Sequence, residues 1–220
     1  MKIKSIQTSK TARYILSTEP SKEIKYIWIV CHGYGQSAVG FLNWFKPIFC
    51  EDTLIVAPEG LSKFYWEGFN GKVVSSWMTK ENREEEIIDY VNFIETIVNE
   101  LKPKLNSDVK FNALGFSQGT ATIARWANHT SIKLSSIHMW SGQFPDDLLN
   151  CWNKKQLPSL NFYVGDNDPF VDDSIVDEQK IKLKNMGINS KTKVFTGKHK
   201  VEKIPLIEIN KQQKHNPNKE

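Results

Sequence analysis

Several short apolar runs along the chain have the length and composition of buried strands. Residues 26–31 (YIWIVC) and 53–57 (TLIVA) are apolar at nearly every position. A strand that is apolar on both faces is typical of the middle of a parallel sheet that is covered on both sides. Further strands are predicted at residues 109–114, 134–140, 160–164 and 192–195, with an opening hairpin at residues 3–7 and 12–16.

Segments with a helical period of apolar residues alternate with these strands. Between residues 81 and 101 the apolar side chains recur every three or four positions, acidic residues occupy the first turn, and Pro103 ends the segment. Strands that alternate with helices predict a mostly parallel central sheet with helices on both faces, and therefore an α/β fold. Further helices are predicted at residues 38–49, 120–127, 173–186 and 201–211.

One domain accounts for this alternation. We expect a single α/β domain over residues 1–210, without a separate lid domain, and then a polar tail at residues 211–220 that lacks fixed structure. A chain of 220 residues with 40% hydrophobic residues can bury one sizeable core. No apolar run approaches 18 residues, so no membrane span is expected.

The three cysteines, Cys31, Cys50 and Cys151, are odd in number and have no C-x-x-C spacing. This pattern favours free thiols in a reducing compartment over a disulfide framework or a zinc site. The first 17 residues carry lysines but no apolar segment of the kind found in signal peptides. Together these features predict a cytoplasmic protein without a bound metal.

The net charge of +4 is concentrated near the C-terminus. Residues 176–220 hold eleven lysines and five acidic residues. The lysines have no interleaved aromatic residues and belong to no nucleic-acid-binding motif, so a solvated face is a better interpretation than a nucleic-acid site. We therefore expect no nucleic acid as a partner.

Candidate chemistry begins at the pentapeptide Gly115-Phe116-Ser117-Gln118-Gly119. It follows a predicted strand and precedes a predicted helix, which is the context that G-x-S-x-G needs in order to form a nucleophile elbow. The two glycines allow the strand and the helix to approach closely around a strained serine. The alternative is a glycine-flanked turn with an ordinary exposed serine.

A serine nucleophile needs a base and an acid that orients the base. Among five histidines, His199 is the best candidate, because it follows the last predicted strand and comes after Ser117 as the expected order of nucleophile, acid and base requires. The loop after residues 160–164 offers both Asp166 and Asp168, and spacing alone does not separate them. The other four histidines fit less well. His32 precedes the nucleophile and is expected to brace its own loop. His129 lies at a helix end, His138 inside an apolar strand and His215 in the tail.

Four motifs in this order, HGYGQS, GFSQG, GDNDPFV and GKH, resemble the phospholipase/carboxylesterase family of α/β-hydrolases, which includes acyl-protein thioesterases. The segment around Trp77 resembles the tryptophan segment that precedes the long helix in that family. The resemblance implies that Asp168, which directly precedes a proline, is the acid. It also implies that the backbone N–H groups of Gln118 and Tyr34 form the oxyanion hole, and that no metal or cofactor takes part.

The chain departs from the family pattern at three places. Thr120 stands where the family usually has another glycine, residues 58–60 read Pro-Glu-Gly, and Phe170 follows the Asp-Pro pair in place of leucine. These changes concern the substrate pocket more than the chemistry. Residues 60–77 are rich in aromatic side chains and are predicted to form either a hydrophobic cluster under a loop or an acyl pocket. Trp77 and Phe170 are the candidate substrate contacts.

These features together predict a serine ester hydrolase. It would cleave small to medium acyl esters of a small-molecule substrate through Ser117, His199 and Asp168, with an acyl-enzyme intermediate. Alternatives on the same triad are a thioesterase or esterase for acyl-proteins or lysophospholipids, and a peptidase. An alternative of another class is a catalytically silent binding module with the same fold. The oligomeric state stays open between a monomer and a homodimer.

Overall fold

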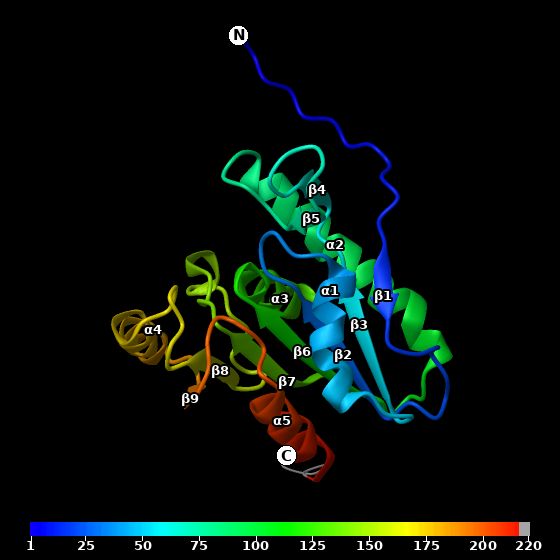
Figure 1. Cartoon of the computed structure of the whole chain (residues 1–220), viewed down its shortest axis with the longest axis vertical. Coiled ribbons are helices and arrows are strands. Elements are labelled where there is room, and N and C mark those ends of the chain that lie inside the picture. Colours follow the sequence, from blue (N-terminus) through cyan, green and yellow to red (C-terminus); the bar gives the residue numbers. More distant parts are fainter. Residues whose placement is uncertain (216–220) are drawn as a thin grey trace.

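The computed structural model describes residues 1–215 of the chain (Figure 1). Seven strands of this part form one sheet, in which β1 is antiparallel to its neighbour and the other strands run parallel. The prediction of a mostly parallel sheet is therefore confirmed. Across the sheet the order is β1 (Tyr14–Leu16), β3 (Thr53–Pro58), β2 (Tyr26–Cys31), β6 (Lys110–Phe116), β7 (Leu134–Trp140), β8 (Leu160–Gly165) and β9 (Ser190–Phe195).

Helices cover both faces of the sheet, because successive side chains of a strand point to opposite faces. The helices are α1 (Ala38–Leu42), α2 (Arg83–Leu101), α3 (Gln118–His129), α4 (Asp173–Asn185) and α5 (Lys203–His215), and short 3₁₀ helices are η1 (Asn43–Ile48), η2 (Lys102–Lys104) and η3 (Asp146–Leu148). In β2, Ile29 packs with residues of α2 and α3 on one face, whereas Trp28 packs with residues of α1 and α5 on the other.

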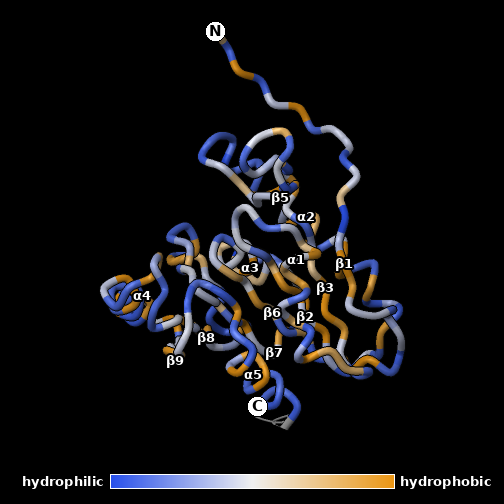
Figure 2. The backbone as a smooth tube through the Cα atoms, in the orientation of Figure 1, coloured by the Kyte–Doolittle hydropathy of each residue, from blue (hydrophilic) through white to orange (hydrophobic). Residues whose placement is uncertain are grey.

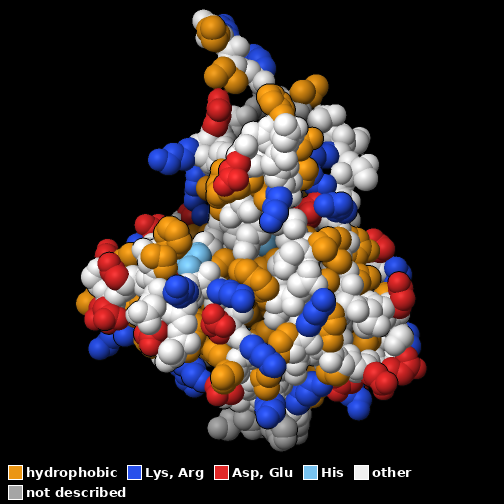
Figure 3. Space-filling model, viewed as in Figure 1, with side chains coloured by type: hydrophobic (Ala, Val, Ile, Leu, Met, Phe, Trp, Pro, Cys, Tyr) orange, Lys and Arg blue, Asp and Glu red, His pale blue; other side chains and the backbone are white. Residues whose placement is uncertain are grey.

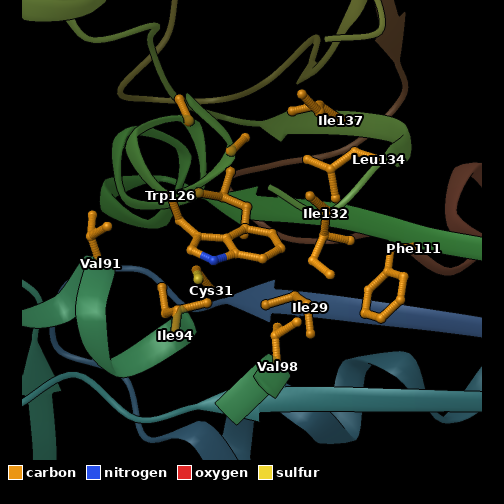
Figure 4. Packing of buried hydrophobic residues seen from close by; sticks show 14 of the residues in the cluster. Ile29, Cys31, Val91, Ile94, Val98, Phe111, Trp126, Ile132, Leu134 and Ile137 are labelled. Atoms are coloured by element: carbon orange, nitrogen blue, oxygen red, sulfur yellow. The ribbon is translucent and has the colours of Figure 1, made fainter. Parts of the chain in front are cut away.

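The larger core lies between the sheet and helices α2 and α3. Figure 4 shows Trp126 of α3 among Ile29, Cys31 and Ile94, which belong to the same core cluster, and all four are fully buried. Each aliphatic side chain buried in this way contributes ~1.5–3 kcal/mol to folding. The hydropathy colouring of Figure 2 follows the same division, with hydrophobic central strands and hydrophilic surface loops. No helix among residues 1–215 is long and apolar enough to cross a membrane.

A small antiparallel hairpin, β4 (Ser62–Tyr65) and β5 (Val73–Ser76), projects from the main sheet (Figure 1). It lies within residues 60–77, the aromatic segment that was predicted to form either a hydrophobic cluster or an acyl pocket. Its loop turns so tightly that a Cβ on Gly71 would lie 1.5 Å from the Trp66 carbonyl oxygen. Figure 3 shows hydrophobic side chains at the surface of the upper part of the molecule, where this hairpin lies, and the Phe69 side chain is almost fully exposed.

The predicted opening hairpin is wrong. Residues 1–13 contain no strand, and the N-terminal end of this segment extends away from the body of the molecule in Figure 1. Only Tyr14–Leu16 forms a strand, and it pairs with β3 in antiparallel register, Tyr14 opposite Pro58. An alternating sequence favours a strand only when another strand offers hydrogen bonds along its edge, and residues 3–7 have no such neighbour.

Two helical predictions also need correction. The helix predicted at 38–49 is a short α-helix followed by the 3₁₀ helix η1, because Pro47 has no backbone N–H to donate and interrupts the α-helical ladder. The tail predicted without structure at 211–220 begins as helix, since α5 runs to His215. The rest of that tail, 216–220, lies outside the described residues.

The two outer strands of the sheet differ in character. β1 is only three residues long, and its register with β3 covers all three. β9 is longer and carries two exposed lysines, Lys191 and Lys193, of which Lys193 pairs with Glu208 of α5. Exposed lysines on an outer strand are typical of edges that do not pair with another chain.

A buried carboxylate joins the N-terminal part of the chain to the sheet. Glu59 directly follows β3, and its side chain is 2% exposed. Its Oε1 accepts a hydrogen bond from Arg13 Nη2 at 2.9 Å, and Lys63 Nζ lies 2.7 Å from its Oε2. Burial alone would raise the pKa of Glu59, but Arg13 and Lys63 outweigh burial and lower the pKa to about 2.

We expect Glu59→Gln to lower the free energy of unfolding at pH 7 by about 1–3 kcal/mol, because the hydrogen bonds to two cations are weakened. The pKa of Glu59 is lower in the folded than in the unfolded chain. Its stabilising effect is therefore complete above about pH 5 and is lost as the pH falls toward 2. Urea unfolding followed by tryptophan fluorescence measures the difference. Glu51→Gln, at an exposed position, is the control, and a difference that persists unchanged at pH 3 would contradict the prediction.

Candidate active site

Ser117 lies in a strained turn between β6 and α3, with φ 52° and ψ −118°. Its backbone N–H donates to the Trp140 carbonyl oxygen at 2.9 Å, which holds the turn against β7. A Cβ on Gly115 would lie 2.1 Å from Gly119 O, and a Cβ on Gly119 would lie 2.2 Å from Cys31 O. Only glycine fits at either position, so the sequence forms the strand, sharp turn and helix expected of a nucleophile elbow.

His199 and Asp168 form a hydrogen-bonded pair at the same end of the sheet. His199 Nδ1 lies 2.9 Å from each carboxylate oxygen of Asp168. The Asp168 side chain is completely buried, and its Oδ1 also accepts the backbone N–H of Phe170 at 2.9 Å. The imidazole ring packs between Phe116 and Phe170, at centroid distances of 4.8 and 4.7 Å. A carboxylate can only accept here, so Nδ1 of the neutral ring carries the proton and Nε2 keeps its lone pair.

Asp166, the second aspartate of this loop, has a different partner. Its Oδ1 accepts the backbone N–H of Gly197 at 3.0 Å and the Asn167 side-chain amide at 2.7 Å. The Gly197 hydrogen bond is the main cause of a lowered pKa of Asp166. Asp166 thus ties the loop after β8 to the loop that carries His199, and the structure brings Asp168, not Asp166, to the imidazole.

Ser117 and His199 line one open cleft with a volume of about 400 Å³. Phe170, the other candidate substrate contact, is 69% exposed and lines the cleft as well. Thr120, at the position of the family's usual glycine, is part of the wall, and its hydroxyl donates to the Ser117 carbonyl oxygen at 2.6 Å. The wall is completed by residues of α3, of the segment after β7 and of the loop after β8: Ala121, Arg125, Ser141, Gly142, Gln143, Phe144, Pro145, Asp146 and Val171.

The loop that carries Tyr34 rests on a buried histidine. His32 is fully buried, with Nδ1 2.7 Å from Gly33 O, and Gly60 N–H donates to its Nε2 at 3.0 Å. Because Nε2 accepts, the ring proton resides on Nδ1 and donates to Gly33 O. Burial lowers the pKa of His32 to about 4. His32 therefore braces its loop as a neutral group, in agreement with the role predicted from the sequence.

The backbone around Tyr34 and Gln118 leaves two N–H groups unused. Gly33 N–H donates to Gln36 Oε1 at 2.8 Å and Gly35 N–H donates to Ser75 O at 3.1 Å, which fixes the turn on both sides of Tyr34. Gln118 is the first residue of α3, so its N–H precedes the helical ladder. Within residues 1–215, neither the Tyr34 nor the Gln118 N–H has a hydrogen-bond partner.

Trp77 is a correction to the predicted substrate contacts. Its side chain is 1% exposed and belongs to the larger core, and it does not line the cleft. The indole N–H donates to His32 O at 2.8 Å, and the ring packs 4.9 Å from the His32 ring. Trp77 therefore supports the Tyr34 loop through its contacts with His32. The sequence around Trp77 does not indicate whether its ring points into the core or toward the cleft.

The roles of two side chains near the cleft were not predicted from the sequence. The Gln118 side chain accepts from Trp77 N–H at 3.1 Å and donates to Met78 O at 2.9 Å, which fixes the start of α3. Arg125 lies in the cleft wall, and its guanidinium donates to both carboxylate oxygens of Asp147 at 2.9 and 2.7 Å. Hydrogen bonding to Arg125 lowers the pKa of Asp147 to about 2. A lone arginine among the apolar residues of 123–127 in the predicted helix was the available signal.

Metal-binding residues do not gather in this region. No group of three or more histidine, cysteine, aspartate or glutamate side chains within residues 1–215 is placed to hold a metal ion. Cys31 is buried in the core, and Cys50 and Cys151 are exposed and unpaired with each other.

Comparisons with known proteins agree with this fold. The family model for phospholipase/carboxylesterase matches residues 15–213. Among solved structures, Zea mays acyl-protein thioesterase 2 is 17% identical, with a TM-score of 0.72 over 94% of this chain and 100% of that chain. Esterase PE8 is 19% identical, with a TM-score of 0.68 over 94% and 99%. The Bacillus cereus carboxylesterase is 15% identical, with a TM-score of 0.62 over 93% and 94%. No curated protein sequence matches the chain. The predicted α/β-hydrolase fold is confirmed.

We expect His32 to remain neutral, with its proton on Nδ1, from pH 8 down to about pH 5, because burial lowers its pKa to about 4. The unfolded chain, with an ordinary histidine pKa of ~6.5, binds this proton first, so the His32 contribution to stability declines as the pH falls below that value. Long-range ¹⁵N–¹H NMR spectra report the tautomer, with His32→Gln to assign the signals and urea-unfolded protein as the reference. A proton on Nε2, or protonation in the folded protein near pH 6.5, would refute the prediction.

Proposed function

The chain belongs to the phospholipase/carboxylesterase family, and from this premise we propose that it is a serine esterase with Ser117 as nucleophile, His199 as base and Asp168 as orienting acid. It is a hydrolase that acts on carboxylic ester bonds. The finer assignment rests on one observation. Ser117, in its strained turn, and His199, which is hydrogen-bonded to the buried Asp168, line a common cleft.

The proposed reaction begins when Ser117 Oγ attacks the ester carbonyl carbon and gives its proton to His199 Nε2. Asp168 holds the Nδ1–H tautomer and stabilises the imidazolium that results. The carbonyl oxygen becomes an oxyanion, which the unused N–H groups of Gln118 and Tyr34 would receive. Such a donor typically contributes 10²–10³ in rate. His199 then protonates the leaving alcohol, and water repeats the sequence to release the acid.

The cleft supports small to medium acyl esters as substrates. A volume of about 400 Å³ lies toward the small end of ligand sites, and the wall mixes apolar surfaces such as Phe144 and Val171 with polar groups such as Gln143 and Asp146. Each additional CH₂ gains ~0.8 kcal/mol only where apolar surface is available to bury it. Rates should therefore rise over short p-nitrophenyl esters and stop rising beyond roughly eight carbons.

A thioesterase for long acyl chains is the second candidate. Zea mays acyl-protein thioesterase 2 shares the fold, and the β4–β5 hairpin beside the Tyr34 loop exposes Trp66 and Phe69 to solvent. The Trp66 ring lies 6.0 Å from the Tyr34 ring, so the apolar surface of the hairpin continues onto the Tyr34 loop. A kcat/KM that keeps rising to palmitoyl esters or thioesters would favour this candidate over the short-chain esterase.

We expect Ser117→Ala to abolish both ester hydrolysis and labelling by a fluorophosphonate probe, because the reacting oxygen is removed. Thermal stability should not fall, since alanine adopts the same turn with no lost hydrogen bond of the side chain. Ser131→Ala, at an exposed position, is the matched control and should label fully. Full labelling of the Ser117→Ala variant would reject the assigned nucleophile, and no labelling of the wild type would favour a silent binding module.

Asp168→Asn should lower kcat by about 10⁴, because an amide cannot hold the same imidazole tautomer. Asp166→Asn is the matched control in the same loop, and it should cost less than about tenfold, since an asparagine side-chain oxygen still accepts from Gly197 N–H. Steady-state kinetics on one p-nitrophenyl ester compares the two. Equal losses, or a larger loss for Asp166→Asn, would contradict the assignment of the acid.

A further inference from the structure

Ser141, the residue directly after β7, combines two unfavourable features. Its φ of 49° lies in the left-handed region, which residues other than glycine adopt at a cost. Its side chain is 1% exposed, and the buried hydroxyl has no hydrogen-bond partner among residues 1–215. Both features destabilise the fold, and a glycine would avoid both.

The position of Ser141 indicates a functional reason for these two destabilising features. Two other buried polar atoms in the described chain lack a partner, Trp28 Nε1 and Asn210 Oδ1, and neither residue lines the cleft. Ser141 lines the same cleft as Ser117 and His199. Strain and unpaired polar groups that persist at a reactive site are typical of residues kept for function.

The sheet order places Ser141 between the strand end that carries Ser117 and the strand ends that lead to Asp168 and His199. The end of β7 lies between the end of β6, which carries Ser117, and the end of β8, which leads to Asp168. The Ser117 N–H donates to Trp140 O, and the Ser141 N–H donates to Tyr163 O of β8 at 2.8 Å. The Asp168–His199 pair must therefore cross the end of β7 to reach the nucleophile.

The backbone at this point is held firmly. A Cβ on Gly142 would lie 2.6 Å from Ser117 O and 2.5 Å from Thr120 Oγ1, so the turn packs directly against the nucleophile. The indole N–H of Trp140 donates to Lys200 O at 2.9 Å, which joins the end of β7 to the residue after His199. Ser141 thus has a fixed backbone next to both halves of the site, whereas its hydroxyl proton has no partner and is free to rotate.

We propose that Ser141 is a positioning residue whose hydroxyl hydrogen-bonds to the Asp168–His199 pair when His199 takes the proton of Ser117, which rests on the proposed esterase function. The hydroxyl keeps its own proton throughout, and its dipole reorients toward the charged pair. A hydrogen bond to an ionised group in a buried site is stronger than one to a neutral group. The interaction therefore stabilises the transition state more than the resting enzyme.

Other charged groups around His199 stay the same when Ser141 is changed. Asp168 faces it from the loop after β8, and Lys198 and Lys200 flank it on its own loop. Arg125 of α3 and Asp146 of η3 line the same cleft. A change of rate in a Ser141 variant therefore reports the hydroxyl or the backbone of residue 141, and two variants separate these.

The test compares Ser141→Ala, which removes the hydroxyl and keeps a Cβ, with Ser141→Gly, which also relieves the backbone. Both should lower kcat and the rate constant of fluorophosphonate labelling by about tenfold, with KM unchanged. Ser141→Gly should nevertheless melt higher than the wild type, by roughly 2–4 °C, and Ser141→Ala no lower. A residue with a purely structural role would not lose activity while the protein gains stability.

The matched control is Ser136→Ala on the same strand. Ser136 is buried, but its hydroxyl is paired with Asn112 Oδ1 at 2.7 Å and His138 Nε2 at 2.8 Å, so the variant should melt lower and keep its kcat. Unchanged kcat in both Ser141 variants, a rise in KM alone, or a loss confined to Ser141→Gly would each overturn the proposal. A wild-type protein that resists fluorophosphonate labelling would overturn the esterase function itself, which distinguishes the two failures.

Discussion

The site depends on the parallel pairing of six strands of the main sheet, which are β3, β2, β6, β7, β8 and β9. In a parallel sheet all carboxyl ends meet at one edge, so loops that are distant in sequence become neighbours. Ser117 follows β6, Asp168 follows β8 and His199 follows β9. The same edge receives the Tyr34 loop from β2. Register in this sheet therefore determines chemistry, because a shift of one residue would turn each terminal side chain toward the opposite face.

The site is built from conformations that are unfavourable by themselves. Ser117 and Ser141 both have positive φ, and Gly115 and Gly119 bring backbones within distances that no Cβ would permit. Such strain persists only when the surrounding structure determines the conformation. Here the elbow helix carries Trp126 into the larger core, and hydrogen bonds tie the turn to β7. The apolar core thus stabilises the reactive geometry as well as the fold.

Local signals in the sequence predicted much of this molecule, whereas contacts between distant segments escaped it. The spacing of apolar residues predicts the buried strands and the long helix. The two glycines that flank Ser117, between a predicted strand and a predicted helix, predict the nucleophile elbow. Spacing in the sequence does not separate Asp166 from Asp168, and only the family resemblance implied Asp168. In the structure Asp166 accepts from Gly197 N–H, whereas Asp168 lies against His199. The predictions of a substrate contact at Trp77 and of a strand at residues 3–7 were wrong for the same reason. The burial of a side chain and the pairing of a strand depend on distant segments of the chain, which the local sequence does not identify.

The outer strands of the sheet bear on how copies of this chain behave together in solution. An unpaired strand edge is a template on which another chain can add its own strand. The lysines of β9 would place like charges opposite one another in such a pairing, and β1 offers only three residues of edge. Growth of the sheet from copy to copy is therefore disfavoured at both ends, and crowding of the protein should not by itself lead to fibres.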